Sequence, residues 1–412
     1  MRVIKAASIA YVIGIALALW GAAPVSRAVV QAAQPQASNS PQKQGQDIFR
    51  FDTFGDEQFW TDVLQLPGVI EGVSPKTALS VGLKVDVDAL PADVRAALAA
   101  QQVNLDDPAV TLALLKLNAV VGVKGQVDDS GHLTTIGVTC ALCHSTVDNS
   151  FAPGIGKRLD GWQNSDLNVG AIVSLSPVID QATKDEFLKW GPGKYDPRHH
   201  IFDGTTLTVI NEPSIPLLIP PIYGLKGVGF ETVTADGPIS YWNAYVGVSQ
   251  MGGHGSFSDQ RIGVSITQTP DLVTPKLPAL LAYQLSLKPP TPDASTFDRQ
   301  AANRGRELFD GAAGCSTCHM RPNFTDVLSG PDKDVPFLHT PAEVGIDPAY
   351  AERTATRMYR TTPLRALAFH APYFHDGSAP DLLAVVNHYD TLFNLHLTAA
   401  EKADLVEYLK SL

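Results

Sequence analysis

The chain lacks an excess of basic residues, since 31 Lys and Arg face 42 Asp and Glu among 412 residues, for a formal net charge of −11. That balance argues against a nucleic-acid partner, which needs clustered positive charge to bind phosphates, and favours a soluble acidic protein. After residue 28 the sequence also lacks any apolar run long enough to span a bilayer. With 44% hydrophobic residues the chain can form more than one ordinary core, so its length favours two domains with additional segments.

The first residues predict export. Arg2 and Lys5 precede an apolar run at residues 9–20, and small residues follow up to Ala28. This pattern is typical of a secretory signal peptide, with cleavage expected after Ala28. A retained membrane anchor is the alternative, but it would need a longer apolar run. We therefore expect a periplasmic protein with no membrane partner once residues 1–28 are removed.

Cysteine is scarce, and all four cysteines fall in two short motifs, CALCH at residues 140–144 and CSTCH at residues 315–319. Two cysteines at this spacing followed by histidine are the attachment signature of c-type haem. Each thiol adds to one vinyl group, and the histidine becomes the proximal iron ligand. Part of a zinc site is the alternative, which two complete motifs that use every cysteine disfavour. We predict two covalently bound haem c groups, held by Cys140, Cys143, His144, Cys315, Cys318 and His319.

The sequence repeats one plan around the two motifs. The predicted closing helices match at Tyr283 with Tyr408 and at Leu287 with Leu412, and Pro-containing strings that end in Asp-Gly precede both helices. Such a duplication predicts a mainly α chain with two tandem cytochrome c-like haem domains. We expect a signal peptide (1–28), a flexible tether (29–47), an N-terminal extension (48–120), a first haem domain (121–287), a linker (288–297) and a second haem domain (298–412).

Local signals place several elements within this plan. Pro91 predicts the first turn of a helix over residues 91–98, and Asp381 predicts the start of another. The string Asp129-Ser-Gly131 predicts a hairpin turn ahead of the first motif. Residues 29–46 are rich in Gln, Ala, Ser and Pro without a hydrophobic period, which is typical of a flexible tether.

Two strings in the second half, GRELFDGAAGCSTCHMRPNFTD and YRTTPLRALAFHAPYFHDGS, closely resemble the C-terminal haem domain of the bacterial di-haem cytochrome c peroxidases and their MauG-like relatives. The resemblance is strong over residues 305–389, weaker over the first unit and absent over residues 29–120. It implies that the second haem accepts electrons and relays them to the first haem, where peroxide or oxygen is activated.

Sixth ligands distinguish an electron carrier from a reactive iron. In this family the helix after YFHDG supplies the sixth ligand of the second haem, which is Met in the peroxidases and Tyr in MauG. The corresponding helix here, APDLLAVVNHYD, has no Met, and Tyr389 lies on its apolar face and at the family position. The resemblance implies that Tyr389 binds the second iron, where a phenolate would lower the reduction potential. A core tyrosine, or ligation by Met358, is the alternative.

The first unit departs from the family pattern. The string GIGK at residues 154–157 has no histidine where the peroxidases carry a removable distal one, and Lys157 is expected to be solvated. Ala235 stands before Asp-Gly where the family keeps a tryptophan between the haems. Trp242 could replace that tryptophan, although a packed aromatic is the simpler interpretation. Both losses put a standard peroxidase cycle in doubt.

Three residues near SQMGGHGSF are candidates for the first haem. Met251 is a candidate sixth ligand, which would close the iron to substrates. If the iron is open, Gln250 could orient a bound oxygen species and His254 could supply the acid–base group. The pair His199 and His200 sits in a charged loop and is expected to be exposed.

The resemblance also implies partners. A calcium ion would bind near His370, Pro372 and Asn211, through backbone carbonyls and the Asn side chain. A small redox protein would donate or accept electrons, and hydrogen peroxide or oxygen would be the oxidant. Two functions remain open at this point. One is a periplasmic di-haem oxidoreductase that reduces peroxide or uses an oxidant on another substrate, and the other is a non-enzymatic di-haem electron carrier.

Overall fold

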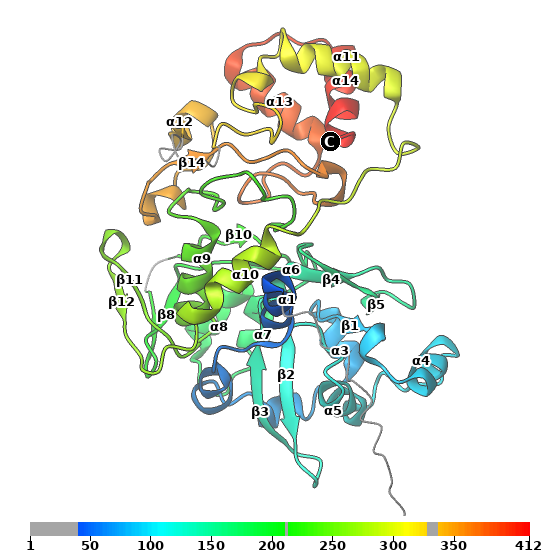
Figure 1. Cartoon of the computed structure of the whole chain (residues 1–412), viewed down its shortest axis with the longest axis vertical. Helices are drawn as coiled ribbons and strands as arrows, with labels where there is room; N and C mark the ends of the chain where they lie inside the picture. Colours follow the sequence, from blue (N-terminus) through cyan, green and yellow to red (C-terminus); the bar gives the residue numbers. More distant parts are fainter. Residues whose placement is uncertain (1–39, 211–212, 328–336) are drawn as a thin grey trace, which may run out of the picture. The chain divides into compact units, whose positions relative to one another are not determined.

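The computed structural model describes residues 40–210, 213–327 and 337–412 (Figure 1). The predicted signal peptide, and the predicted tether up to residue 39, lie outside the described residues. No helix within these ranges is long and apolar enough to cross a bilayer. The α-helices are α1 (Pro41–Phe51), α2 (Pro67–Ile70), α3 (Pro75–Ser80), α4 (Ala92–Ala99), α5 (Pro108–Lys116), α6 (Ala141–His144), α7 (Val169–Val173), α8 (Gln181–Leu188), α9 (Ile239–Tyr245), α10 (Leu277–Gln284), α11 (Arg299–Asp310), α12 (Pro341–Val344), α13 (Leu382–Phe393) and α14 (Ala399–Lys410).

Helix outweighs strand among the described residues, which confirms the prediction of a mainly α chain. The strands there form only two-stranded ladders, of which β1 with β5 is parallel. The antiparallel ladders pair β2 with β3, β4 with β6, β7 with β10, β8 with β9, β11 with β12 and β13 with β14. The strands are β1 (Val85–Asp86), β2 (Val123–Val127), β3 (Leu133–Val138), β4 (Ser145–Val147), β5 (Ile155–Gly156), β6 (Arg158–Asp160), β7 (Lys194–Tyr195), β8 (His200–Phe202), β9 (Leu207–Val209), β10 (Leu217–Leu218), β11 (Phe257–Asp259), β12 (Val264–Ile266), β13 (Leu338–His339) and β14 (Tyr359–Arg360).

Several local predictions are confirmed. The hairpin ahead of the first motif is β2 and β3, and Gly131 in its turn has a φ of 87°, which residues with a Cβ rarely adopt. The predicted helix over residues 91–98 is α4. Asp381 caps α13, because its side chain accepts a hydrogen bond from the Ala384 backbone N–H at 2.8 Å.

In the second unit, helices α11 and α14 cross at a glycine. A Cβ atom at Gly305 of α11 would overlap the carbonyl oxygen of Asp404 in α14. One turn further along α11, the ring of Phe309 packs edge-on against Tyr408 of α14, with 5.2 Å between ring centroids. The absence of a side chain at residue 305 therefore permits the close approach that buries both aromatic rings.

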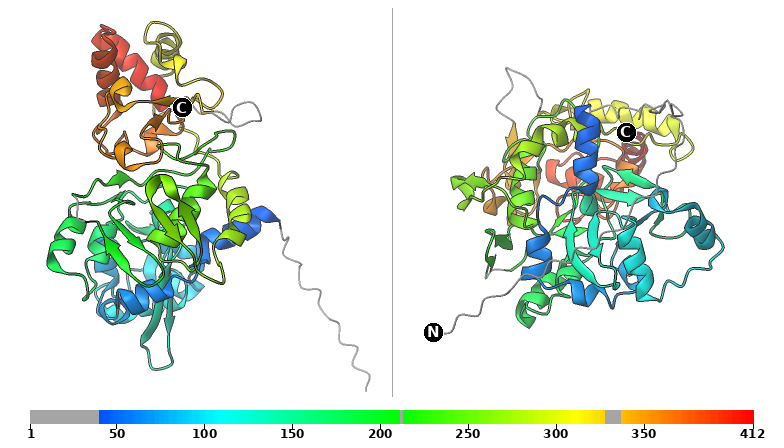
Figure 2. Two further views of the ribbon diagram at one scale, coloured as in Figure 1. Left: turned by 90° about the vertical axis from the view of Figure 1, so that its left-hand side faces the viewer. Right: turned by 60° about the horizontal axis from the view of Figure 1, so that its bottom comes forward.

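Helices α1 and α10 of the first unit meet in the same way, and Figures 1 and 2 show α1 in blue beside α10. A Cβ atom at Gly45 would overlap the carbonyl oxygen of Ala279, and the ring centroids of Phe49 and Tyr283 lie 5.5 Å apart. Each pair thus combines Gly-x-x-x-Phe on its first helix with a tyrosine on its last. The structure extends the predicted duplication to this pair of helices.

Helix α1 corrects the predicted tether. The tether is predicted to reach residue 47, but residues 41–47 begin α1, and the Ser40 side chain caps the helix by accepting a hydrogen bond from the Lys43 N–H. The physical reason is an apolar face within a polar sequence, formed by Gly45, Ile48 and Phe49, which are buried against α10. The first unit therefore starts well before its predicted boundary at residue 121.

Residues 48–120 also differ from the prediction of a separate N-terminal extension. Phe54 shares one hydrophobic core with Tyr283 of α10. Leu114 shares a second core with Leu142, which lies inside the first motif. Residues 52–139 separate α1 from the first motif, whereas only residues 311–314 separate α11 from the second. The segment is therefore an insertion packed into the first unit.

Candidate functional site

The first CxxCH motif forms the short helix α6 and a tightly held histidine. His144 Nδ1 lies 3.0 Å from the carbonyl oxygen of Pro220, so this nitrogen carries the proton and donates to the backbone. Burial lowers the pKa of His144 to about 4. The imidazole is therefore neutral at pH 7, with Nε2 free of protons, which is the form and the atom that bind a metal.

The second motif repeats this arrangement. Its cysteines lie in and after a 3₁₀ turn, Cys315–Thr317, and His319 Nδ1 lies 3.0 Å from the carbonyl oxygen of Phe324. Burial lowers the pKa of His319 as well. Both motif histidines are thus oriented by a backbone carbonyl, as axial ligands of metal centres usually are. These residues fit the covalent haem groups that the sequence predicts.

The thiols themselves do not resemble reactive or zinc-binding thiolates. All four cysteines are half-buried, and none of them forms a disulfide. Burial is the main cause that raises the pKa of Cys140 and of Cys143 to about 12, and that of Cys315 to about 11. Nucleophilic and metal-bound cysteines need the opposite shift. The environment therefore suits thiols that end as uncharged thioethers.

Tyr389 lies on α13 with its hydroxyl near the second motif. Burial, followed by the charges of Cys318 and Cys315, raises the pKa of Tyr389 to about 12. Its ring stacks on Phe393 with centroids 5.9 Å apart, and its hydroxyl makes no hydrogen bond within the described residues. The neighbouring His388 points elsewhere, since its Nε2 lies 2.8 Å from the carbonyl oxygen of Val344.

The inserted segment contacts the candidate residues of the first haem. The Trp60 indole N–H donates to the carbonyl oxygen of Met251 at 2.9 Å. The His254 backbone N–H donates to the carbonyl oxygen of Phe54 at 2.8 Å. The Met251 side chain is half-buried and packs against the two cores that include Cys140 and Cys143. His254 Nε2 is enclosed by protein and has no hydrogen-bond partner among the described residues.

Gln250 is held by the protein on both sides of its amide. Its Oε1 accepts a hydrogen bond from the Tyr195 hydroxyl at 2.8 Å, and its Nε2 donates to the carbonyl oxygen of His200 at 2.9 Å. Tyr195 OH also lies 3.2 Å from His200 Nε2. Burial lowers the pKa of His200 to about 4. The amide is therefore engaged in positioning Tyr195 and His200, a role that sequence analysis did not assign.

The expectation that His199 and His200 are exposed is wrong. Their exposed fractions are 2% and 5%, because both rings pack in an aromatic cluster with Phe187 and Trp190. The surrounding charges had indicated a solvated loop. The aromatic residues at positions 187, 190 and 195 were the sequence signal that could have indicated a buried loop.

A buried acid from the insertion also lies near the first motif. Asp56 is fully buried, and its carboxylate accepts the Val138 backbone N–H at 3.1 and 3.2 Å. Burial raises the pKa of Asp56 well above its usual range. The sequence shows acids among the aromatics of residues 49–60, but nothing in that pattern singles out this one.

Other predicted residues have simpler surroundings. Lys157 is exposed, and the ring of Trp242 packs against Tyr245 with centroids 5.5 Å apart. Ala235 has a left-handed backbone, with φ of 50°. Asn211 lies outside the described residues, so the calcium ion stays a prediction.

One group of metal-ligating side chains occurs within the described ranges. The potential ligand atoms of Cys318, Asp326 and His339 lie within 4.8 Å of one another. Cys318 belongs to the second motif, and His339 Nε2 is engaged by Asp326 at 3.1 Å. We therefore assign the group to the surroundings of the second motif rather than to a separate metal site.

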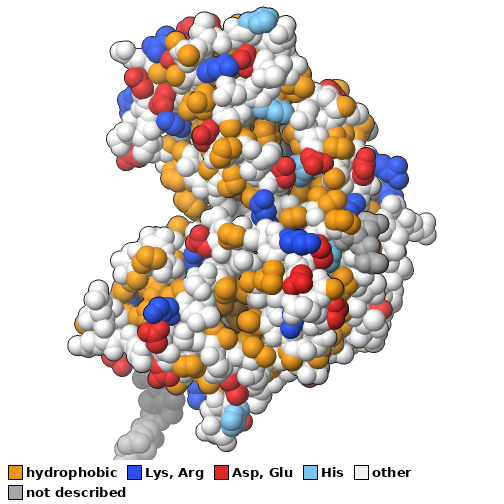
Figure 3. Space-filling model, turned by 180° about the vertical axis from the view of Figure 1, so that it is seen from behind, with side chains coloured by type: hydrophobic (Ala, Val, Ile, Leu, Met, Phe, Trp, Pro, Cys, Tyr) orange, Lys and Arg blue, Asp and Glu red, His pale blue; other side chains and the backbone are white. Residues whose placement is uncertain are grey.

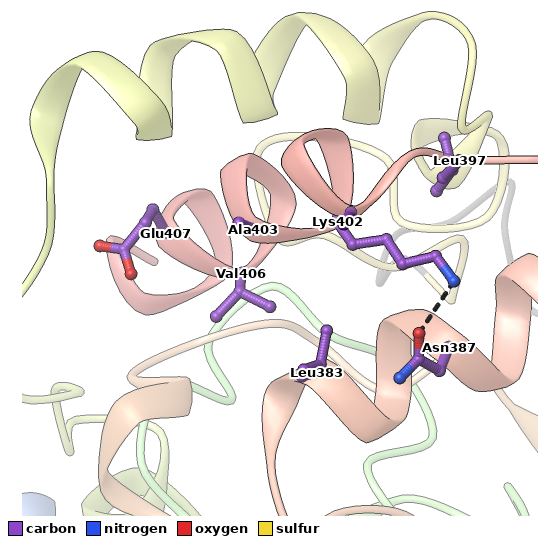
Figure 4. Close-up of a pocket in the computed structure, with 8 residues that line it drawn as sticks. Leu383, Asn387, Leu397, Lys402, Ala403, Val406 and Glu407 are labelled. Atoms are coloured by element: carbon purple, nitrogen blue, oxygen red, sulfur yellow. Dashed lines mark hydrogen bonds between the residues drawn. The ribbon is translucent and has the colours of Figure 1, made fainter.

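A recess of about 480 Å³ lies between α13 and α14, away from Tyr389. Figure 4 shows Lys402 of α14 reaching Asn387 of α13, at 2.9 Å. Asn387 and Tyr389 are two residues apart on a helix and so point to opposite sides. The recess therefore lies on the face of α13 opposite to Tyr389.

The two CxxCH motifs with their oriented histidines are typical of c-type haem proteins, and comparisons with known proteins agree with that class. The chain is 32% identical over 128 residues to methylamine utilization protein MauG of Methylorubrum extorquens, which covers 27% of this chain and 34% of that protein. It is 29% identical over 150 residues to cytochrome-c peroxidase IdrP2 of Pseudomonas sp. (strain SCT), which covers 29% of this chain and 41% of that protein. These matches confirm the resemblance to the di-haem cytochrome c peroxidases and their MauG-like relatives.

These matches are partial. The chain spans between 34% and 48% of the length of the curated relatives it matches, and no family model matches it. A solved MauG-like protein associated with microbial copper homeostasis matches at 22% identity with a TM-score of 0.28, over 36% of this chain and 62% of that one. Hydrazine synthase of Kuenenia stuttgartiensis matches at 23% identity with a TM-score of 0.30, over 52% of this chain and 76% of that one. Neither structural likeness bears on function.

Proposed function

We propose that this chain is an exported, periplasmic di-haem c-type oxidoreductase that reduces hydrogen peroxide with electrons from a small redox protein. Each turnover would consume two electrons and two protons and release two waters. Use of peroxide or oxygen to oxidise another substrate is the variant of this reaction that relatives named MauG suggest. The observation that carries the proposal is the repeated motif histidine, which in both units is half-buried, neutral and fixed through Nδ1 by a backbone carbonyl.

The residues around each motif have distinct proposed roles. When bound, haem supplies the iron centres that store electrons and bind the oxidant. His144 and His319 would each bind a haem iron, and Tyr389 would also bind the iron of the second unit. His254 would hold and release a proton, which its enclosed and unpartnered Nε2 supports. Gln250 would keep Tyr195 and His200 in place rather than touch the oxidant.

A non-enzymatic electron carrier is the second candidate function, and one observation favours it. Met251 packs in both cores that include the first-motif cysteines, where its thioether could serve as a sixth ligand. A carrier of this kind would have two six-coordinate irons. It would need no proton donor at His254.

Spectra and turnover of the purified protein separate the two functions. We expect a ferric high-spin signal that shifts with cyanide, and peroxide turnover with a reduced small cytochrome. A His254→Gln variant should lose about 10²- to 10⁴-fold in turnover, the usual contribution of a general acid or base. His132→Gln is the matched control, since its side chain is 70% exposed. Two low-spin haems whose spectra do not change with cyanide, before and after half-reduction, would instead support the function of a non-enzymatic electron carrier.

A further inference from the structure

A basic recess of about 420 Å³ lies where the linker leaves the first unit. Its walls come from three places in the sequence, and the Gly224 backbone N–H donates to the Leu287 carbonyl at 2.8 Å between two of them. The side chain of Arg365, from the TTPLR string, lies directly over Gly224. The lining residues are Gly224, Lys226, Leu285, Ser286, Leu287, Lys288, Pro289 and Arg365.

The recess holds three cations and no carboxylate. On the face drawn in Figure 3, acidic and basic side chains are interspersed. In the recess, by contrast, Lys226, Lys288 and Arg365 have no ion pair or side-chain hydrogen bond to any described residue. The recess therefore has an excess of positive charge, whereas the whole chain has a net charge of −11.

Arg365 is the member that most needs a partner. Its Nη2 is enclosed by protein and has no acceptor among the described residues. Burial alone lowers the pKa of Arg365, so no carboxylate lies close enough to offset it. A guanidinium cannot lose its proton to escape this cost, and buried charges are therefore normally paired.

The recess also shares two chain segments with backbone partners of the motif histidines. Lys226 follows Pro220, whose carbonyl orients His144, by six residues. Arg365 follows Thr362, whose backbone hydrogen-bonds His319, by three. A negative group bound here would therefore influence the electrostatic potential at either motif.

We propose that this recess binds a carboxylate or small oxyanion through the fork of Arg365, with Lys226 and Lys288 at its rim. Two sources share this chemistry: a propionate of a bound haem, or an anion from solution such as inorganic phosphate. A guanidinium carries five N–H donors, so Arg365 can bind an oxygen of either group through the donors that face the recess. The propionate source rests on the proposed two-haem assignment, whereas the solute source does not.

Reduction potentials of the haem-loaded protein test the proposal, measured in chloride buffer and again with inorganic phosphate added. If a propionate is the ligand, Arg365→Gln lowers the potential of one haem in both buffers, because a nearby positive charge is lost. If a solute anion is the ligand, added phosphate lowers the wild-type potential until binding saturates, and Arg365→Gln abolishes this response.

Matched variants keep the test decisive. Arg299→Gln removes an exposed cation at the start of α11 and should leave both potentials unchanged. Lys226 is also exposed, and Lys226→Gln should shift the reduction potential in the same direction as Arg365→Gln but by less. If Arg365→Gln retains no haem, Lys226→Gln is measured in its place. Potentials equal to wild type for all variants in both buffers would overturn the proposal. Since no peroxide is involved, that result would leave the proposed function standing.

Discussion

A Tyr389→Phe variant is expected to change the ferric visible and EPR spectra of one haem and to raise its reduction potential. A phenolate oxygen bound to iron would stabilise the ferric state, so its loss should favour the ferrous state. We also expect peroxide turnover to fall about 10- to 100-fold, the scale seen when groups that tune a metal centre are removed. Optical spectra, EPR and a potentiometric titration measure the spectral and redox effects, and a steady-state assay measures turnover.

The position of the Tyr389 hydroxyl is the reason for this expectation. It lies near both second-motif thiols and makes no hydrogen bond within the described residues, so it is free to bind another group. Tyr373→Phe is the matched control, because that hydroxyl donates to the Leu367 carbonyl at 2.6 Å. An unchanged spectrum in Tyr389→Phe would identify Tyr389 as a core residue and leave Met358 as the alternative ligand.

The second large effect concerns stability. Gly305→Ala should destabilise the haem-loaded protein by about 1–3 kcal/mol, because the new methyl group must push α11 away from the Asp404 carbonyl. Gly45→Ala should have a similar effect through the Ala279 carbonyl at the crossing of α1 and α10. Thermal or denaturant unfolding, followed by haem absorbance and by circular dichroism, measures both losses.

Gly68 supplies the control for these substitutions. It is exposed in the short helix α2, and no heavy atom lies within 4 Å of the place that a Cβ atom would take, so Gly68→Ala should be neutral or slightly stabilising. A neutral Gly45→Ala beside a destabilising Gly305→Ala would mean that α1 does not dock on α10. It would also remove α1 from the first unit.

The motifs and the paired Tyr283 and Tyr408 could be predicted from the sequence, because both follow from short-range spacing. The role of α1 as the partner of α10 was missed, although Gly45 and Phe49 repeat the spacing of Gly305 and Phe309. The insertion at residues 52–139 hid that repeat, since it moves α1 far from the first motif. Composition then favoured a tether, because a polar helix with one apolar face resembles a linker until its partner is known.

The candidate site was harder to predict than the fold. Tyr389 emerged from helical periodicity together with a family position. The surroundings of Gln250 depend instead on Tyr195 and His200, which reach it through non-local packing. Contacts of the insertion with Met251 and His254 have no counterpart in the resemblance and could only come from the structure.

The most direct test is the intact mass of the purified mature protein, read together with its alkaline pyridine absorption spectrum. The mass should exceed that of the polypeptide by two haem groups, and Cys315→Ser with Cys318→Ser should remove one of them. A mass equal to that of the bare polypeptide, with no haem absorption, would contradict the account.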